Sequence, residues 1–276
     1  MQINSLVSVI ISTKNSGKNL NQCLESIKNQ TYKNIEIIIV DNNSIDNTKA
    51  IARQYTQKVF DYGPERSSQR NYGAKKSSGN YFLFIDSDME LGQNVVKECV
   101  EKIYHSNVKG LIISEKSFGQ GFWSQCKKLE RSFYIGIDWM EAARFFDKES
   151  FYNVSGYKEN MVAGEDWDLS QRIKKNGGME RINDVIFHNE GKTLLLSTIK
   201  KKFYYAQHFH NYASSNQHKD SFKKQTGIIR RYGLFFSQPK KLFKNPLLGI
   251  GMLFMKTCEF GFGGIGLLIG KIKNKI

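Results

Sequence analysis

Residues 80–91, NYFLFIDSDMEL, join an apolar run directly to two acids that stand one residue apart. The run at 81–85 is continuous and bulky, which predicts a strand buried on both faces. Asp86 and Asp88 follow it at once. An ionised carboxylate is costly to remove from water unless a cation compensates it. The pair therefore either faces solvent in a turn or holds a cation. Other motifs in the sequence distinguish these two interpretations.

Two earlier runs predict further buried strands, at residues 6–12 and 35–40, with a helical pattern between them. Strands that alternate with helices in this way predict an α/β fold, in which helices flank a mostly parallel sheet. Ligands of such sheets bind beyond the carboxyl ends of the strands. The polar groups at 12–15, 41–44 and 86–88 should therefore share one rim of the sheet.

Three blocks along the chain resemble family 2 glycosyltransferases of the GT-A fold. They are SVIISTKNSGKNLNQCLESIKNQTYKNIEIIIVDNNSIDNT at 8–48, RNYGAKKSSGNYFLFIDSDMEL at 70–91 with its DxD triplet, and GEDWDLSQRIKKNG at 164–177. A lone DxD triplet is weak evidence for this family, because such triplets are common. Three matching blocks in the right order over residues 6–192 are strong evidence for it. The resemblance implies a Rossmann-like sheet and a metal-dependent, inverting transfer of a sugar from a nucleotide-sugar donor to an acceptor hydroxyl or phosphate.

The acids after the third strand suit a divalent cation. Residues i and i+2 of a strand end lie on the same side, and hard carboxylate oxygens suit Mg²⁺ or Mn²⁺ that also binds a diphosphate. By resemblance, Asp86 lies near the ribose and at the metal, Asp88 is the main metal ligand, and His188 is an additional ligand. The alternatives are a solvated turn for the two acids and a structural histidine for His188.

The resemblance assigns four more residues to the site that binds the nucleotide-sugar donor. Asp41 should contact the nucleobase, with Thr13 and Asn15 lining the same pocket, and Arg70 should face the base or the phosphates. For Asp41 the alternative is an Asx turn that opens the loop after its strand. For Arg70 it is a helix residue that faces solvent.

Asp166 is the predicted catalytic base, because an inverting transfer needs a carboxylate to take the proton of the acceptor hydroxyl. It follows Gly164 at the start of a predicted helix, where the helix dipole favours an anion. The alternative is an acid that only caps the first turn. Asp168 is expected to pair with Arg172 at i,i+4 on the helix surface.

The chain from Lys192 onward has 16 basic residues and two acidic ones, a net charge of +14 out of +15 for the whole protein. We therefore predict a catalytic domain over residues 1–192 and a basic, largely helical region over 193–276 that binds an anionic membrane surface. Residues 247–270 are about long enough to span a bilayer, but Lys256 and Glu259 interrupt them. This favours helices lying in the interface, with a single C-terminal span as the alternative. The GFGGIG run at 261–266 indicates close helix packing or membrane contact.

The N-terminal segment, MQINSLVSVIIS, lacks the pattern of a signal peptide, which predicts a cytoplasmic enzyme on the inner face of the membrane. The acceptor is then expected to be a lipid-linked glycan or a polyprenyl phosphate. Two rivals remain. A sugar-phosphate nucleotidyltransferase would need a glycine-rich loop after the first strand, where STKNSGKN has one glycine. A nucleic-acid-binding protein would explain only the basic tail.

Overall fold

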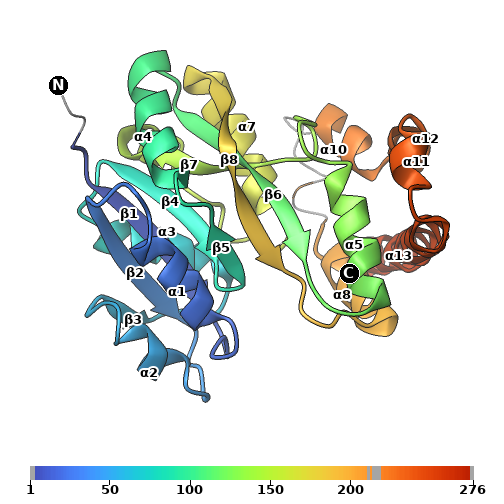
Figure 1. Cartoon of the computed structure of the whole chain (residues 1–276), viewed down its shortest axis with the longest axis horizontal. Helices are drawn as coiled ribbons and strands as arrows, with labels where there is room; N and C mark the ends of the chain where they lie inside the picture. The colour runs from blue at the N-terminus through green and yellow to red at the C-terminus, as the bar shows by residue number, and fades with distance from the viewer. Residues whose placement is uncertain (1–3, 210–211, 213–218, 274–276) are drawn as a thin grey trace. The chain divides into compact units, whose positions relative to one another are not determined.

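The computed structural model describes residues 4–209, 212 and 219–273 (Figure 1). The chain forms two compact units. The sheet unit comprises Met1–Glu115, Ala142–Glu159 and Glu165–Asn189, and the helical unit comprises Lys116–Glu141, Asn160–Gly164 and Glu190–Ile276. The helical unit thus contains two segments that precede residue 192, in addition to the basic tail.

One sheet of eight strands runs in the order β3-β2-β1-β4-β7-β6-β8-β5. Its strands are β1 Val7–Thr13, β2 Ile35–Asp41, β3 Val59–Asp61, β4 Tyr81–Asp86, β5 Met89–Leu91, β6 Gly110–Phe118, β7 Ala143–Asp147 and β8 Met179–Asn189. Strands β3, β2, β1 and β4 are parallel, whereas β7 is antiparallel to both β4 and β6, and β5 is antiparallel to β8. The α/β fold is confirmed, but the sheet is mixed, and its parallel part ends at β4.

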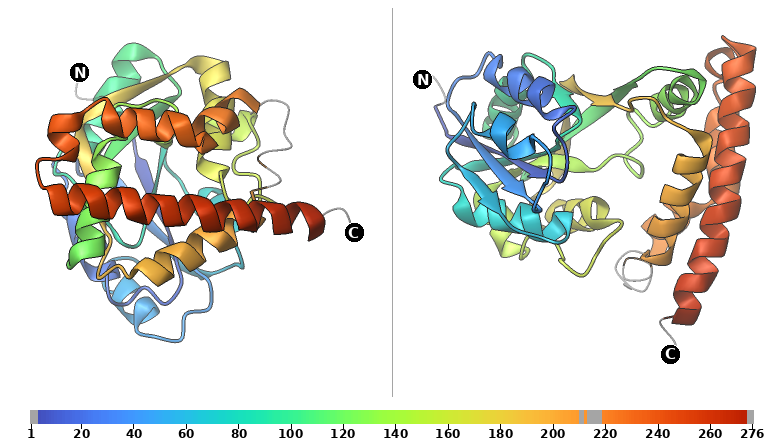
Figure 2. Two further views of the ribbon diagram at one scale, coloured as in Figure 1. Left: turned by 90° about the vertical axis from the view of Figure 1, so that its right-hand side faces the viewer. Right: turned by 90° about the horizontal axis from the view of Figure 1, so that it is seen from below.

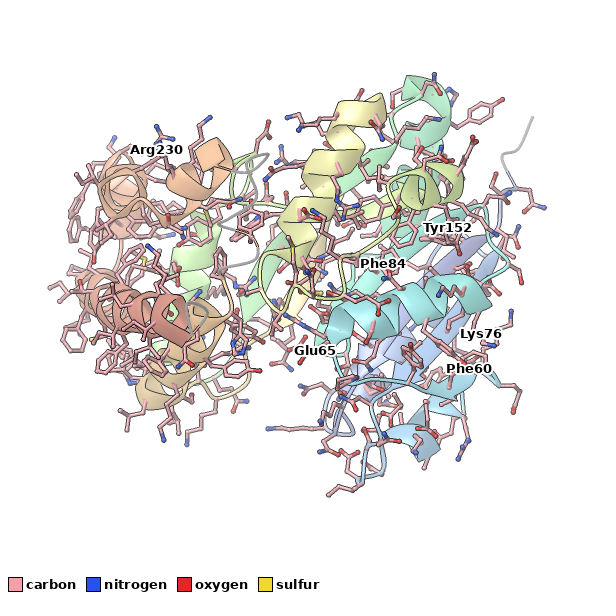
Figure 3. The ribbon with its side chains drawn as sticks, turned by 180° about the vertical axis from the view of Figure 1, so that it is seen from behind. Phe60, Glu65, Lys76, Phe84, Tyr152 and Arg230 are labelled. Carbon is pink, nitrogen blue, oxygen red and sulfur yellow. The ribbon has the colours of Figure 1, made fainter. Side chains whose placement is uncertain are left out.

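Six helices belong to the sheet unit: α1 Leu20–Lys28, α2 Thr48–Ala52, α3 Arg66–Lys76, α4 Val95–Ser106, α6 Lys148–Asn153 and α7 Glu165–Gly177. Alternate residues of β1 enter different cores. Val9 and Ile11 join a cluster that includes residues of α1 and α4, and Ile10 joins a cluster with Phe84 and residues of α3 and α7. Phe84 lies on the sheet, 5.3 Å from Phe151 between ring centroids (Figure 3). Helices therefore cover both faces, as the continuous apolar runs predicted.

The register of the parallel strands brings their polar ends together. Thr13 lies opposite Asp41, and Ser12 lies opposite Asp86. The predicted common rim is therefore confirmed for the ends of β1, β2 and β4.

The helical unit comprises α5 Phe122–Ser132, α8 Leu195–Gln207, α10 Lys219–Thr226, α11 Ile228–Phe236, α12 Pro239–Leu242 and α13 Pro246–Lys273. Helix α13 packs against α5 and α8, and α8 runs beside it (Figure 2). Gly266 permits this close approach, because a Cβ there would lie 2.6 Å from the carbonyl oxygen of Phe203 in α8. The expected glycine packing thus applies to Gly266. A Cβ at Gly261, Gly263 or Gly264 would meet no atom of another described residue within 4 Å.

Candidate active site

Asp41, at the end of β2, is completely buried and takes three hydrogen bonds. Its Oδ1 accepts from the Thr13 hydroxyl at 2.7 Å and the Ser44 hydroxyl at 2.6 Å, and its Oδ2 accepts from the Ser44 backbone N–H at 2.7 Å. The bond to the Ser44 N–H spans three residues, whereas the Asx turn of the alternative interpretation would reach only two residues on, although it too holds the loop after β2. The structure thus brings Asp41 and Thr13 together and fixes the Asp41 side chain.

Asn15 locks the loop after β1 onto the loop after β2. Its backbone lies in the left-handed region, with φ of 49°, which asparagine tolerates better than most residues. Its N–H donates to the Ser44 hydroxyl at 2.7 Å, and its Oδ1 accepts from the Ile45 N–H at 3.0 Å. The expected pocket residues 13, 15 and 41 are therefore held on one rigid part of the rim.

Arg70 is completely buried, which shows that the solvent-facing alternative is wrong. One guanidinium nitrogen donates to Asp86 at 2.8 Å, and the other terminal nitrogen donates to Asp166 at 2.8 Å. The guanidinium carbon lies 5.1 Å from the centroid of the Tyr157 ring, which adds a cation–π contact. Arg70 therefore joins the end of β4 to the start of α7, a connection that the sequence analysis did not predict.

Asp86 stays ionised because two arginines surround it. Burial alone would raise the pKa of its carboxyl, but Arg70 and Arg144 outweigh burial and hold that pKa well below its usual range. The nearer Arg144 nitrogen lies 3.8 Å from Asp86 Oδ2. The first acid of the DxD triplet thus has cationic partners within the protein itself.

Two adjacent acids begin α7 and have different environments. Glu165 is buried, and its Oε1 lies 3.2 Å from Arg66 and 3.7 Å from Arg70. Burial, helped by the charge of Asp166, raises the pKa of Glu165 to about 7, although both arginines oppose the rise. Asp166 keeps 27% of its side chain exposed. Of the two, only Asp166 is open enough to meet a substrate.

Asp168 pairs with Arg172 as predicted, but this pair is not on the surface. The Asp168 side chain is fully buried, with Oδ2 accepting from Arg172 Nε at 2.7 Å and Oδ1 lying 2.9 Å from Lys158. Arg172 also donates to the backbone oxygen of Gly156 at 2.7 Å. Asp168 therefore anchors α7 to the segment before it and has no open oxygen for a reaction.

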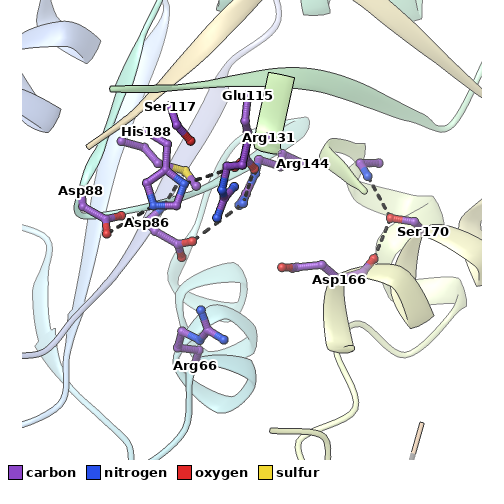
Figure 4. A network of polar contacts seen from close by, with 12 residues as sticks. Arg66, Asp86, Asp88, Glu115, Ser117, Arg131, Arg144, Asp166, Ser170 and His188 are labelled. Carbon is purple, nitrogen blue, oxygen red and sulfur yellow. Dashed lines mark hydrogen bonds and ion pairs between the residues drawn. The ribbon is translucent and has the colours of Figure 1, made fainter. Parts of the chain in front are cut away.

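Asp88, which directly precedes β5, lies near His188 of β8, the strand that pairs with β5 (Figure 4). His188 Nε2 lies 3.5 Å from Asp88 Oδ2, and His188 Nδ1 lies 3.3 Å from Glu115 Oε2. Glu115 in turn accepts from Arg144 at 2.6 and 2.8 Å. Glu115 and Arg144 were not predicted from the sequence, where each is only a charged residue next to the apolar part of its strand, β6 or β7.

The chemistry of Asp88 and His188 suits a divalent cation, since a carboxylate oxygen and an imidazole nitrogen converge beside a second acid. No group of three or more His, Cys, Asp or Glu residues is arranged for a metal within the part of the chain that the structure describes. The protein thus offers a partial ligand set. Such a set fits an ion whose remaining positions are filled by substrate phosphates and water, as is usual for Mg²⁺.

Solved structures share this architecture over nearly the whole chain. TarS from S. aureus (residues 1–349) matches with a TM-score of 0.56 and 16% identity, covering 95% of this chain and 90% of that one. The mannosyltransferase PcManGT from Pyrobaculum calidifontis matches with a TM-score of 0.62 and 16% identity, covering 98% and 87%. The fold is that of the GT-A glycosyltransferases.

Residues 8–157 match the family described as Glycosyl transferase family 2, and the chain belongs to that family. A β-1,3-glucosyltransferase of Campylobacter jejuni, named for GalNAc(5)-diNAcBac-PP-undecaprenol, is 25% identical over 91% of this chain and 79% of its own length. Glycosyltransferase GlyA of Streptococcus pneumoniae is 35% identical over 37% of this chain, and the match spans only 16% of that relative. The chain therefore carries a glycosyltransferase family 2 domain, and its matches span less than half the length of several curated relatives.

Proposed function

We propose that the protein transfers a sugar from a nucleotide-sugar donor to an acceptor, with inversion at the anomeric carbon and with the help of a divalent cation. One observation carries this proposal: the buried Arg70 holds the partly exposed Asp86 and Asp166 together, at 2.8 Å from each. The donor-side acid and the exposed acid of α7 are thereby fixed around one place on the rim.

Mg²⁺ or Mn²⁺ would be held by Asp88 and His188, with Asp86 beside them. When bound, such an ion supplies positive charge to the diphosphate that leaves with the nucleotide. Support comes from the two converging donors and from two solved structures, one of PcManGT with GDP-Man and Mn²⁺ and one of TarS with UDP-GlcNAc. Thr13, Asn15 and Asp41 would line the nucleoside pocket.

Asp166 would act as the general base. Its carboxylate is partly exposed, and Arg70 fixes one of its oxygens, so the other is free to receive the proton of an acceptor hydroxyl that attacks the anomeric carbon from the face opposite the leaving group. Asp168 is excluded from this role by its burial between two cations.

The reaction is tested by incubating the protein with Mn²⁺, a panel of nucleotide sugars and polyprenyl-linked acceptors, and by determining the anomeric configuration of any product by NMR. Asp166→Asn should abolish most transfer, whereas Glu149→Gln should not. Glu149 is the matched control, because it is an exposed acid in the first turn of α6. Equal activity of the two variants would contradict the role of Asp166 as the base, and a retained configuration would contradict inversion.

A nucleotidyltransferase is disfavoured by the loop after β1. Its one glycine, Gly17, already donates its backbone N–H to Asp46 at 3.0 Å. That loop therefore does not offer the free row of glycine N–H groups that cradles a triphosphate.

The acceptor is proposed to be lipid-linked, in line with the name of the Campylobacter jejuni relative. Within the described residues, Pro246–Ile272 is long and apolar enough to cross a membrane by length and composition. Its two central charges, however, face the interior of the helical unit: Lys256 pairs with Glu130 and Glu259, and Lys127 lies 3.2 Å from Glu259. The charges that interrupt the apolar run are thus neutralised inside the unit.

The opposite face of α13 is apolar and exposed, and we propose that it lies in the plane of the membrane. A span is disfavoured, because α8 runs along α13 and carries Lys200 and Lys201 on its surface, and charges are costly at the centre of a bilayer. Exposed Arg230 on α11 adds to the basic surface of the unit (Figure 3). The exposed apolar residues of α13 are Leu247, Ile250, Phe254, Phe262, Ile265, Leu268 and Ile272.

Vesicle flotation tests this orientation. The full chain should bind anionic vesicles at low salt, and Leu247→Asn combined with Leu268→Asn should weaken that binding. Alkaline carbonate should release the protein from membranes, whereas retention in the membrane would establish a span. Binding to duplex DNA in place of vesicles would support the nucleic-acid alternative. A chain ending near residue 192 is a poor probe, because it would lack α13 and so lose the packing of α13 on Cys126 and its ion pairs with Lys127 and Glu130 of α5.

A further inference from the structure

We propose that Glu115 is a positioning residue that holds His188 with its Nε2 lone pair facing Asp88 and the metal. The inference rests on the proposed metal-dependent function, and it assigns a role to a residue outside the DxD triplet and outside α7. Three side chains carry it: Arg144 on β7, Glu115 on β6 and His188 on β8.

The two Glu115 oxygens have separate partners. Oε1 accepts from Arg144 Nε at 2.8 Å and lies 2.6 Å from Arg144 Nη2, whereas Oε2 lies 3.3 Å from His188 Nδ1 (Figure 4). Only 10% of the Arg144 side chain and 14% of the His188 side chain are exposed. The chain of contacts therefore runs from a buried arginine to the imidazole with little access for water.

The tautomer of His188 follows from these partners. An ionised carboxylate only accepts hydrogen bonds, so the Nδ1 atom that faces Glu115 has to carry the proton. In the neutral ring the other nitrogen, Nε2, is then left with a lone pair. His188 Nε2 lies 3.5 Å from Asp88 Oδ2, so a ring nitrogen and a carboxylate oxygen lie close together on the side of the ring away from Glu115.

A cation between these two atoms would remove their repulsion. Histidines that bind metals commonly donate their other N–H to a carboxylate, which fixes the ring and makes the ligating nitrogen more basic. Glu115 has the required position, and Arg144 holds it there. Arg144 also lies 3.8 Å from Asp86, so a single arginine supports both the histidine and the first acid of the triplet.

The test is the affinity for Mn²⁺ alone, measured by electron paramagnetic resonance on the full chain. Glu115→Gln should weaken Mn²⁺ binding by roughly 10- to 100-fold, which is the usual effect of losing such a partner. Glu115→Asp keeps the negative charge but has a shorter side chain, so its affinity for Mn²⁺ should lie between those of the wild type and Glu115→Gln. Glu101→Gln is the control, because Glu101 is an exposed acid on α4. Glu115→Gln binding within twofold of the wild type would overturn the inference.

A double-variant cycle separates positioning from a general loss of structure. If Glu115 acts through the histidine, then adding Glu115→Gln to His188→Ala should weaken Mn²⁺ binding no further than His188→Ala alone. Additive losses would overturn the inference, since they would mean that Glu115 acts without His188.

The ¹⁵N spectrum of the His188 imidazole gives a readout that does not depend on the metal. The inference requires a proton on Nδ1 and none on Nε2 in the wild type at neutral pH. Protons on both nitrogens, as in an imidazolium bridging Glu115 and Asp88, would overturn it. If the wild type binds no Mn²⁺, the proposed metal dependence fails, and this spectrum still decides the tautomer that Glu115 is assigned to fix.

Discussion

Replacing Asp168 with asparagine should destabilise the sheet unit by about 3 kcal/mol, because it leaves two cations facing a neutral side chain. Removing one member of a buried ion pair typically costs about 3–5 kcal/mol. The lower end applies here, since the side chain of Lys158 is 39% exposed and gains water when the pair is lost. The side chain of Arg172 is only 12% exposed, although it keeps its bond to the backbone oxygen of Gly156.

The assay is urea unfolding followed by circular dichroism. With a slope of about 1–3 kcal/mol per molar urea, the midpoint should fall by roughly 1–3 M. The matched control is Asp61→Asn, which breaks an ion pair of 2.9 Å with Lys49 whose acid is 51% exposed. Exposed pairs contribute about 0–1 kcal/mol, so this midpoint should barely move. If the two variants have equal midpoints, the structural role assigned to Asp168 is wrong.

Three further outcomes are expected. Asp166→Asn should lower kcat by ~10²–10⁴-fold with the donor KM nearly unchanged, since it removes the proton acceptor and keeps the shape of the side chain; a large rise in KM with normal kcat would speak against the base. The free energy of unfolding should fall as pH rises from 4.5 towards about 7, because over that range the unfolded chain loses the Glu165 proton that the folded chain retains. Glu165→Gln should flatten this slope in pH-dependent urea titrations, and an unchanged slope would contradict the raised pKa. Lys256→Met should destabilise the protein in thermal unfolding, because it leaves the buried carboxylates of Glu130 and Glu259 short of a partner, and an unchanged Tm would contradict that view.

The rim of the sheet was predictable because local patterns determine it. Continuous apolar runs identified β1, β2 and β4, and the parallel register then had to bring their polar ends to one edge. The antiparallel insertion of β7 between β4 and β6 was not predictable in this way. A run of five residues has the same pattern in either direction, and only the path of the chain decides which one it takes.

The partners of the buried charged residues could not be predicted from the sequence either. Helix α3, RSSQRNYGAKK, is polar enough to suggest a solvent-exposed helix, yet Arg70 is buried against acids 16 and 96 residues away. In the sequence, Lys256 interrupts an apolar helix. In the structure, it pairs with Glu130 of α5. Ion pairs between residues so far apart in the sequence depend on how the helices and strands pack. A local stretch of sequence does not contain that information.

The most direct test of the proposed function is calorimetric titration of the protein with UDP, GDP and the other nucleoside diphosphates, with and without Mn²⁺. The metal-dependent account predicts that one of them binds the wild type tightly only when Mn²⁺ is present. It also predicts that Asp88→Asn, which leaves the fold intact because the Asp88 side chain is 38% exposed, loses that Mn²⁺ dependence. Equal affinity with and without the ion, or unchanged Mn²⁺-dependent binding by Asp88→Asn, would contradict it.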